Sequence, residues 1–163
     1  MTKRAAILLG GNLGDVERTL GRACRLLEER AGRIAARSQV MWSEAWGFEA
    51  AEPFGNCAIA VETELEPEAL LDVMQSVERD CGRDREAECR EKSRSGSRYA
   101  SRTLDADLIF YDERVIATER LSVPHPRVAE RAFALRPLAE IMPHYRDPRS
   151  GHTVEQMLRE VEK

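Results

Sequence analysis

The sequence predicts an α+β fold, a ferredoxin-like α/β sandwich with a βαββαβ core and C-terminal additions. Two observations support this. Short apolar segments with the pattern of buried strands alternate with longer segments whose apolar residues recur at helical spacing. The chain also has 163 residues, of which 42% are hydrophobic, which is enough to build one domain around its own core. We therefore expect a single domain over residues 1–163.

The first strand and helix are predicted from the beginning of the chain. Residues 4–9 form an apolar run that indicates a buried strand, which we expect to end at Gly10 and Gly11. Asp15 is a favourable residue for beginning a helix. The apolar residues that follow at helical spacing are Val16, Leu20, Ala23, Leu26 and Leu27.

Two further strands and a second helix complete the middle of the core. Residues 33–42 and 56–65 have strand patterns, and residues 43–55 between them form a loop rich in Gly, Pro and aromatic residues. The second helix is expected to begin at about Pro67 and to end at Gly82. Its apolar face would carry Leu70, Leu71, Met74 and Val77.

After a long polar segment, residues 102–112 have the pattern of the last core strand. A turn at 111–114 follows, and it leads into the short apolar segment 115–118. We expect short helical pieces around residues 127–140 and a last helix capped by Thr153. These elements are the C-terminal additions to the core.

Asp105 and Asp107 are acidic residues within this last strand. Alternation would place them on one face with Ile109 and Tyr111. The opposite face would carry Leu104, Ala106, Leu108 and Phe110. Neighbouring carboxylates repel each other unless a cation lies between them, and Mg2+ commonly binds one or two carboxylates together with substrate phosphates. The pattern is compatible with a Mg2+ site, and the alternative is a strand whose second face is simply solvated.

Arginine residues crowd the polar segment 82–102, although the protein has a net charge of −4. Arg102 directly precedes the two aspartates, so its guanidinium and a bound metal could hold the same polyphosphate. Arg90 and Arg94 alternate with acidic residues and are expected to be solvated. Residues 86–97 contain no large apolar side chain, which predicts a mobile lid.

Five motifs, in the same order along most of the chain, give it a family resemblance. They are GGNLGD, PFGN, GRDR, RTLDADLI and RLSVPHP. On these motifs the chain resembles 6-hydroxymethyl-7,8-dihydropterin pyrophosphokinase of folate biosynthesis. The resemblance implies a ferredoxin-like sandwich that binds ATP with two Mg2+ ions. It also implies transfer of pyrophosphate from ATP to the pterin hydroxymethyl oxygen, with release of AMP.

The resemblance further implies roles for individual residues. Asp105 and Asp107 would be the Mg2+ ligands, and Arg83 and Arg102 would be catalytic arginines. The residues expected to contact ATP are Gln75, Glu78, Arg85, Arg98, Arg120, Ser122, His125 and Arg131. The residues expected in the pterin pocket are Ala45, Trp46, Phe54, Asn56 and Phe133. In that pocket the Asn56 amide would pair with the edge of the heterocycle, and aromatic rings would enclose it.

The chain departs from the family pattern in two places. Gly11 stands where the family usually has serine, and we expect a small effect because glycine keeps the turn. Residues 99–101, Tyr-Ala-Ser, replace Trp-Gly-Pro before Arg102, in a segment longer than the family usually has. This second change concerns the rate and the ATP affinity more than the type of reaction.

Two other functions share part of this pattern. A nucleotidyltransferase also combines a glycine-rich turn with an Asp-x-Asp strand, but it would release pyrophosphate instead of AMP. A non-catalytic ligand-sensing domain of similar shape would not need Arg83, Arg102 and two aspartates to converge. The sequence has neither a Walker-type G-x-x-x-x-G-K-[ST] motif nor a kinase H-R-D motif, which disfavours those phosphoryl-transfer folds.

Composition narrows the partners and the compartment. The net charge of −4 and the pI of about 5.5 argue against a nucleic-acid partner. No C-x-x-C spacing occurs, so the cysteines are expected to be reduced thiols. The N-terminal apolar run is too short for a signal peptide or a membrane span, which predicts a cytoplasmic protein without a membrane partner. We expect a monomer with small-molecule substrates.

Overall fold

An antiparallel sheet of five strands forms the centre of the protein. The computed structural model describes residues 1–43, 53–82 and 103–163. The strands are β1 (Lys3–Gly11), β2 (Gly32–Arg37), β3 (Met41–Ser43), β4 (Phe54–Thr63) and β5 (Asp105–Tyr111). Their order in the sheet is β2-β4-β1-β5, and β3 pairs with β4 beyond the end of β2. Each core helix therefore connects two strands that are separated by a third, which confirms the predicted ferredoxin-like βαββαβ core.

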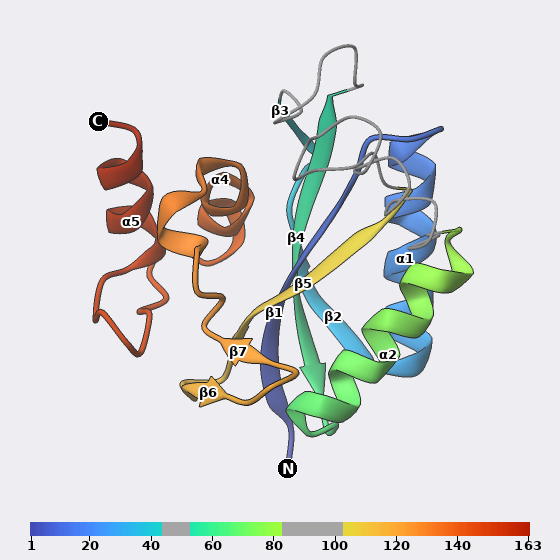
Figure 1. The fold of residues 1–163 in the computed structure, drawn as a ribbon, viewed down its shortest axis with the longest axis horizontal. Coiled ribbons are helices and arrows are strands. Elements are labelled where there is room, and N and C mark those ends of the chain that lie inside the picture. The colour runs from blue at the N-terminus through green and yellow to red at the C-terminus, as the bar shows by residue number, and fades with distance from the viewer. Residues whose placement is uncertain (44–52, 83–102) are drawn as a thin grey trace.

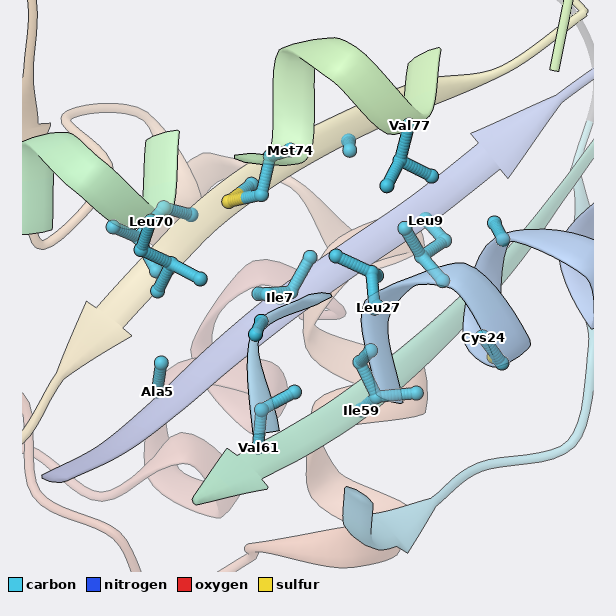
Figure 2. Packing of buried hydrophobic residues seen from close by; sticks show 14 of the residues in the cluster. Ala5, Ile7, Leu9, Cys24, Leu27, Ile59, Val61, Leu70, Met74 and Val77 are labelled. Carbon is cyan, nitrogen blue, oxygen red and sulfur yellow. The ribbon is translucent and has the colours of Figure 1, made fainter. Parts of the chain in front are cut away.

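Helices α1 (Val16–Arg30) and α2 (Pro67–Asp80) cover one face of this sheet, as Figure 1 shows. Asp15 caps α1 as predicted, because its side chain accepts a hydrogen bond from the backbone nitrogen of Arg18. Pro67 begins α2, and Gly82 follows the end of that helix with a positive φ of 93°. In Figure 2 the side chains of Ile7 and Leu9 on β1 point toward Leu27 of α1 and Met74 of α2.

The opposite face carries the C-terminal additions (Figure 1). They comprise the hairpin of β6 (Ile116–Ala117) and β7 (Ser122–Val123), the 3-10 turn η1 (Val128–Glu130), and helices α4 (Ala132–Ile141) and α5 (Val154–Val161). Thr153 caps α5 in a reciprocal pair of hydrogen bonds with Gln156, which confirms the predicted cap. A second apolar cluster lies between these helices and the sheet.

Strict alternation along β5 is wrong beyond Leu108. The pairing of β1 with β5 shifts so that Ile7 pairs with Leu108 and Ala6 pairs with Phe110, which leaves Ile109 as the extra residue of a bulge. Phe110 therefore packs in the cluster on the α4 face. Tyr111 packs on the α1/α2 face instead, where its hydroxyl donates to the Leu65 carbonyl at 2.6 Å.

Two strand boundaries also differ from the predictions. The expected strand 33–42 is two strands, because Ser38 interrupts it. The Ser38 side-chain oxygen accepts a hydrogen bond from the backbone nitrogen of Ala58 at 2.9 Å. β1 does not stop before the glycines but includes Gly10 and Gly11, which pair with Asn56 and Gly55 of β4. At Gly10 a glycine suits the strand because a neighbouring side chain approaches its backbone closely, as described below.

Cys24, Cys57 and Cys81 are buried free thiols, and Cys89 lies outside the described residues. None of the helices in the described ranges combines the length and the apolar character that crossing a membrane requires.

Candidate active site

A row of paired residues crosses the sheet near one of its ends. Met41 of β3 pairs with Asn56 of β4, Asn56 pairs with Gly10 of β1, and Gly10 pairs with Asp105 of β5. Directly paired residues turn their side chains to the same face of a sheet. Asn56 and Asp105 therefore share the α4/α5 face, two strand spacings or roughly 10 Å apart.

Gly10 leaves the space that the Asn56 amide fills. A Cβ atom at Gly10 would lie only 2.4 Å from Oδ1 of Asn56. Asn56 itself is 5% exposed, so its amide has little room to move away. Gly10 is a site residue that the sequence analysis did not identify, because its importance depends on the pairing of β1 with β4.

Asp105 and Asp107 lie on this same face, as predicted. Asp107 pairs with Leu8, which belongs to the apolar cluster under α4 and α5. The two aspartates are separated by one residue, so their backbone positions are about 7 Å apart and both carboxylates can reach one ion. No group of three or more His, Cys, Asp or Glu side chains within the described ranges is arranged to hold a metal. Two carboxylate donors fit Mg2+, which completes its coordination with substrate phosphates and water.

His125 is held next to β5 by its backbone. Its N–H donates to the carbonyl of Ile109, the bulged residue, at 3.0 Å. Its carbonyl accepts hydrogen bonds from the backbone nitrogen of Val128 and from the Arg149 guanidinium, both at 3.2 Å. The bulge in β5 therefore anchors the segment that carries His125.

The imidazole of His125 is neutral at physiological pH. Burial and, to a smaller extent, the nearby guanidinium of Arg131 lower its pKa to about 4, while the carboxylate of Asp105 acts in the opposite direction. The ring nitrogen Nδ1 accepts a hydrogen bond from the backbone nitrogen of Arg127 at 3.2 Å. A neutral ring that accepts at Nδ1 carries its proton on Nε2 and offers that N–H as a donor.

Helix α4 adds Arg131 and Phe133 to this face. Arg131 directly precedes the helix, and its guanidinium lies 5.6 Å from the centre of the Phe133 ring. Helix α4 packs on β4 and β3, and Phe133 is half-buried against the cluster beneath. Phe54 lies two residues before Asn56 on β4, on the same face. An amide, two aromatic rings, a neutral imidazole and two carboxylates are thus distributed over one end of this face.

Four other predicted ATP contacts lie on α2 or in the hairpin of β6 and β7. Gln75 and Glu78 are on α2, and Glu78 accepts a hydrogen bond from the backbone nitrogen of Ala106 at 2.9 Å. Ser122 is exposed on β7. Arg120, in the turn before β7, pairs with Asp72 of α2 at 2.6 Å.

Arg149 is a further residue that the sequence analysis did not identify. It lies in the C-terminal hairpin 147–152, where its backbone nitrogen donates to the buried carboxylate of Asp147 at 2.7 Å. Its side chain reaches the His125 carbonyl. A local turn pattern was the only available signal, and it does not show which distant loop the side chain contacts.

Several predicted residues lie outside the described residues. These are Ala45, Trp46, Arg83, Arg85, Arg98 and Arg102, together with the expected lid 86–97. Their roles remain predictions.

A separate cleft of about 590 Å³ lies at the opposite end of the same face. It is lined by residues of β1, of the end of β5 and the turn after it, and of the segment that follows α4, including Lys3, Arg4, Asp112, Arg114 and Tyr145. Because β1 runs from Lys3 to Gly10 between the two places, the cleft is about 20 Å from the Asn56–Gly10–Asp105 row.

The fold and the site define a class, a ferredoxin-like α/β protein with an Asp-x-Asp strand facing a buried amide. The family model described as 7,8-dihydro-6-hydroxymethylpterin-pyrophosphokinase matches residues 6–143. This chain therefore belongs to the 7,8-dihydro-6-hydroxymethylpterin-pyrophosphokinase family, which confirms the resemblance found in the sequence.

Named relatives agree with this family. The chain is 40% identical over 141 residues to a 2-amino-4-hydroxy-6-hydroxymethyldihydropteridine pyrophosphokinase of Methylorubrum extorquens, covering 86% of this chain and 83% of the relative. It is 38% identical over 142 residues to the enzyme of the same name from Bacillus subtilis, covering 86% and 79%. The solved structure of Plasmodium falciparum HPPK-DHPS with pteroate matches with a TM-score of 0.76 at 13% identity, covering 98% of this chain and 42% of that one. This last likeness concerns the fold.

Proposed function

We propose that the protein transfers the β,γ-pyrophosphoryl group of ATP to 6-hydroxymethyl-7,8-dihydropterin in folate biosynthesis. The pterin hydroxymethyl oxygen attacks the β-phosphorus and loses its proton. The bond between the β-phosphorus and the oxygen that bridges it to the α-phosphorus breaks, and that oxygen leaves as part of AMP. The other product is the pterin diphosphate. The reaction consumes ATP, and a single domain, residues 1–163, would catalyse it.

The observation that carries this proposal is the row of Asn56, Gly10 and Asp105. It places an amide suited to a heterocycle edge and a carboxylate suited to a metal on one face, roughly 10 Å apart. An amide offers both a donor and an acceptor, which matches the alternating edge of a pterin. Phe54 and Phe133 are the aromatic rings that would stack on the ring system.

The residues beside Asp105 would bind the polyphosphate. The Nε2–H of His125 is a neutral donor, and Arg131 is a fixed positive charge next to it. Catalysis of such a transfer consists mainly of positioning and of neutralising charge on the transferring oxygens. Arg83 and Arg102 would supply the larger part of that neutralisation.

Asp105 and Asp107 would hold Mg2+, two ions in all with the phosphates completing their coordination. When bound, the metal would neutralise charge on the phosphate oxygens and bring them into line. Gln75, Arg85, Arg98, Arg120 and Ser122 would contact the nucleotide. Ala45 and Trp46 would complete the pterin pocket.

Product analysis tests this function. The purified protein is incubated with ATP, Mg2+ and the reduced hydroxymethylpterin, and the nucleotide product is identified by chromatography. AMP and the pterin diphosphate are expected in equal amounts. Release of pyrophosphate with an adenylylated pterin would identify a nucleotidyltransferase instead, and absence of any transfer would favour a binding protein.

A further inference from the structure

Glu78 is an acidic residue whose side chain is almost completely buried. It lies on α2 and is only 3% exposed. Its Oε2 accepts a hydrogen bond from the backbone nitrogen of Ala106 at 2.9 Å. Ala106 is the residue between Asp105 and Asp107, so Glu78 binds the backbone at the centre of the Asp-x-Asp motif.

The direction of this hydrogen bond explains why the position matters. β5 lies at one edge of the sheet, with β1 on its inner side, and no described strand pairs with its outer side. Since the Ala106 N–H points outward to Glu78, alternation directs the backbone groups of Asp105 and Asp107 inward to β1. The motif is therefore held from both sides, by the ladder with β1 and by the carboxylate from α2.

We propose that Glu78 is a positioning residue for the metal site. Its hydrogen bond fixes the backbone from which both aspartates project, and so sets the separation and the direction of their carboxylates. Its charge adds a third negative group beside the motif, which strengthens the attraction for a divalent cation. This inference rests on the proposed function, because it takes Asp105 and Asp107 to be the metal ligands.

The burial of Glu78 distinguishes this role from a direct nucleotide contact. A side chain that is 3% exposed presents little surface to a ligand, whereas its bond to Ala106 lies within the protein. Glu78 would then influence ATP through the strand and the metal. The two effects of the carboxylate, hydrogen bonding and charge, can be separated by substitution.

Mn2+ serves as the probe of the metal site, because electron paramagnetic resonance measures how much of it is bound. Affinity is measured for the whole protein alone and with α,β-methylene-ATP, in which the scissile bond is replaced. Glu78→Ala loses both the acceptor and the charge, and we expect Mn2+ affinity to fall about 10- to 100-fold. Glu78→Gln keeps an acceptor oxygen and loses only the charge, so a smaller loss is expected.

Thr63→Val is the matched control for a lost buried contact. Thr63 is 1% exposed, and its hydroxyl donates to the Ala31 carbonyl at 2.6 Å and accepts from the Leu65 backbone at 3.1 Å. It pairs with Lys3, at the end of the sheet away from the aspartates. This variant should lower stability to unfolding and leave Mn2+ affinity unchanged. If it weakens Mn2+ binding as much as Glu78→Ala does, the positioning role is wrong.

The Asp105→Asn variant shows whether a negative result refutes the role of Glu78 or the proposed metal site. If Asp105→Asn weakens Mn2+ binding but neither Glu78 variant does, the metal assignment stands and the role of Glu78 is refuted. If Asp105→Asn binds Mn2+ as the unmodified protein does, the metal assignment fails and the inference fails with it. Faster amide exchange at Ala106 in Glu78→Ala is expected as direct evidence of the lost bond.

Discussion

The two ends of the α4/α5 sheet face organise charge in opposite ways. At the cleft end, opposite charges lie next to each other and are paired. Asp112 accepts a hydrogen bond from the backbone of Arg4 at 2.8 Å and lies 3.9 Å from the Lys3 ammonium. The Tyr145 hydroxyl donates to the Asp112 carbonyl. These groups compensate one another, so this end is suited to holding the structure together.

At the active-site end, charges of one sign come from one short segment. Asp105 and Asp107 project from β5, and Glu78 binds the backbone between them. Positive charge among the described residues comes from a separate segment that includes Arg131. Groups of like charge on one strand favour a cation that is not part of the chain. The active-site end is therefore suited to binding a ligand and the cleft end to stabilising the fold, although both lie on one face.

Removing one acidic charge should have the largest effect. Asp105→Asn or Asp107→Asn should lower kcat about a thousandfold, because several kcal/mol of charge stabilisation by the metal are lost. Stability to unfolding should stay close to that of the unmodified protein, since a repulsion between neighbouring carboxylates is relieved. Steady-state kinetics at saturating Mg2+ and urea unfolding provide the two measurements. Near-normal turnover of either variant would show that the acidic end is not the metal site.

Gly10→Ala tests the space at the centre of the row. The new Cβ would lie 2.4 Å from the Asn56 amide oxygen and would displace it. We expect kcat/KM for the pterin to fall about 10- to 100-fold, a typical cost of misplacing a binding group by about 1 Å. Gly21→Ala on α1 is the control, because its nearest neighbour would be the end of the Arg25 side chain at 3.9 Å. Equal effects of the two substitutions would contradict the importance of this space.

Arg149→Ala should have an intermediate effect that is confined to ATP. It removes the hydrogen bond to the His125 carbonyl, and one such bond contributes about 1 kcal/mol, or about fivefold in KM for ATP. The KM for the pterin should not change. Arg146→Ala is the control from the same hairpin, since Arg146 bonds only to the Gly151 carbonyl among the contacts described for it. A change in both KM values would indicate a general distortion of the face.

His125 should give the folded protein a pH-dependent stability. Its pKa is lowered to about 4 from an ordinary value of 6.5, so the unfolded chain binds a proton between these values and the folded protein does not. Its contribution to stability is therefore present above pH 6.5 and is lost as the pH falls toward 4. Urea unfolding at about pH 7 and about pH 5 should show a larger loss for the unmodified protein than for His125→Gln. If both proteins lose the same stability between these pH values, the His125 imidazole is more solvated than the structure shows.

Tyr145→Phe at the cleft end should have the smallest effect on activity. It removes the hydroxyl that donates to the Asp112 carbonyl, which should lower stability by about 1 kcal/mol. The ring contact with Phe110, at 4.4 Å between centres, is kept. KM for both substrates and kcat should remain unchanged. A changed KM would mean that the two ends of the face are coupled.

Local signals in the sequence predict the helices and strands well, but the sequence does not show which distant segments pair with each other. Asp15 and Thr153 were predicted as helix caps because a cap depends on the next three residues. The same-face placement of Asp105 and Asp107 followed from alternation alone. The bulge at Ile109 was not predictable, since apolar residues occupy both faces there and the shift appears only against β1. The register of Gly10 with Asn56 and the reach of Arg149 likewise depend on segments far apart in the chain.

The place of β5 in the sheet has a consequence for how the protein folds. β1 is made first, and the edge that faces β5 stays without that partner until β5 has been synthesised. Beyond the Ala5–Tyr111 pair, the backbone nitrogen of Asp112 donates to the Arg4 carbonyl, so the two strands join residues more than 100 positions apart. Pairing over such a separation is slow because a long loop must close before any contact forms. Until then β1 exposes an apolar edge that can pair with other chains. Chains that stop before β5 should therefore aggregate rather than accumulate as a stable half-domain.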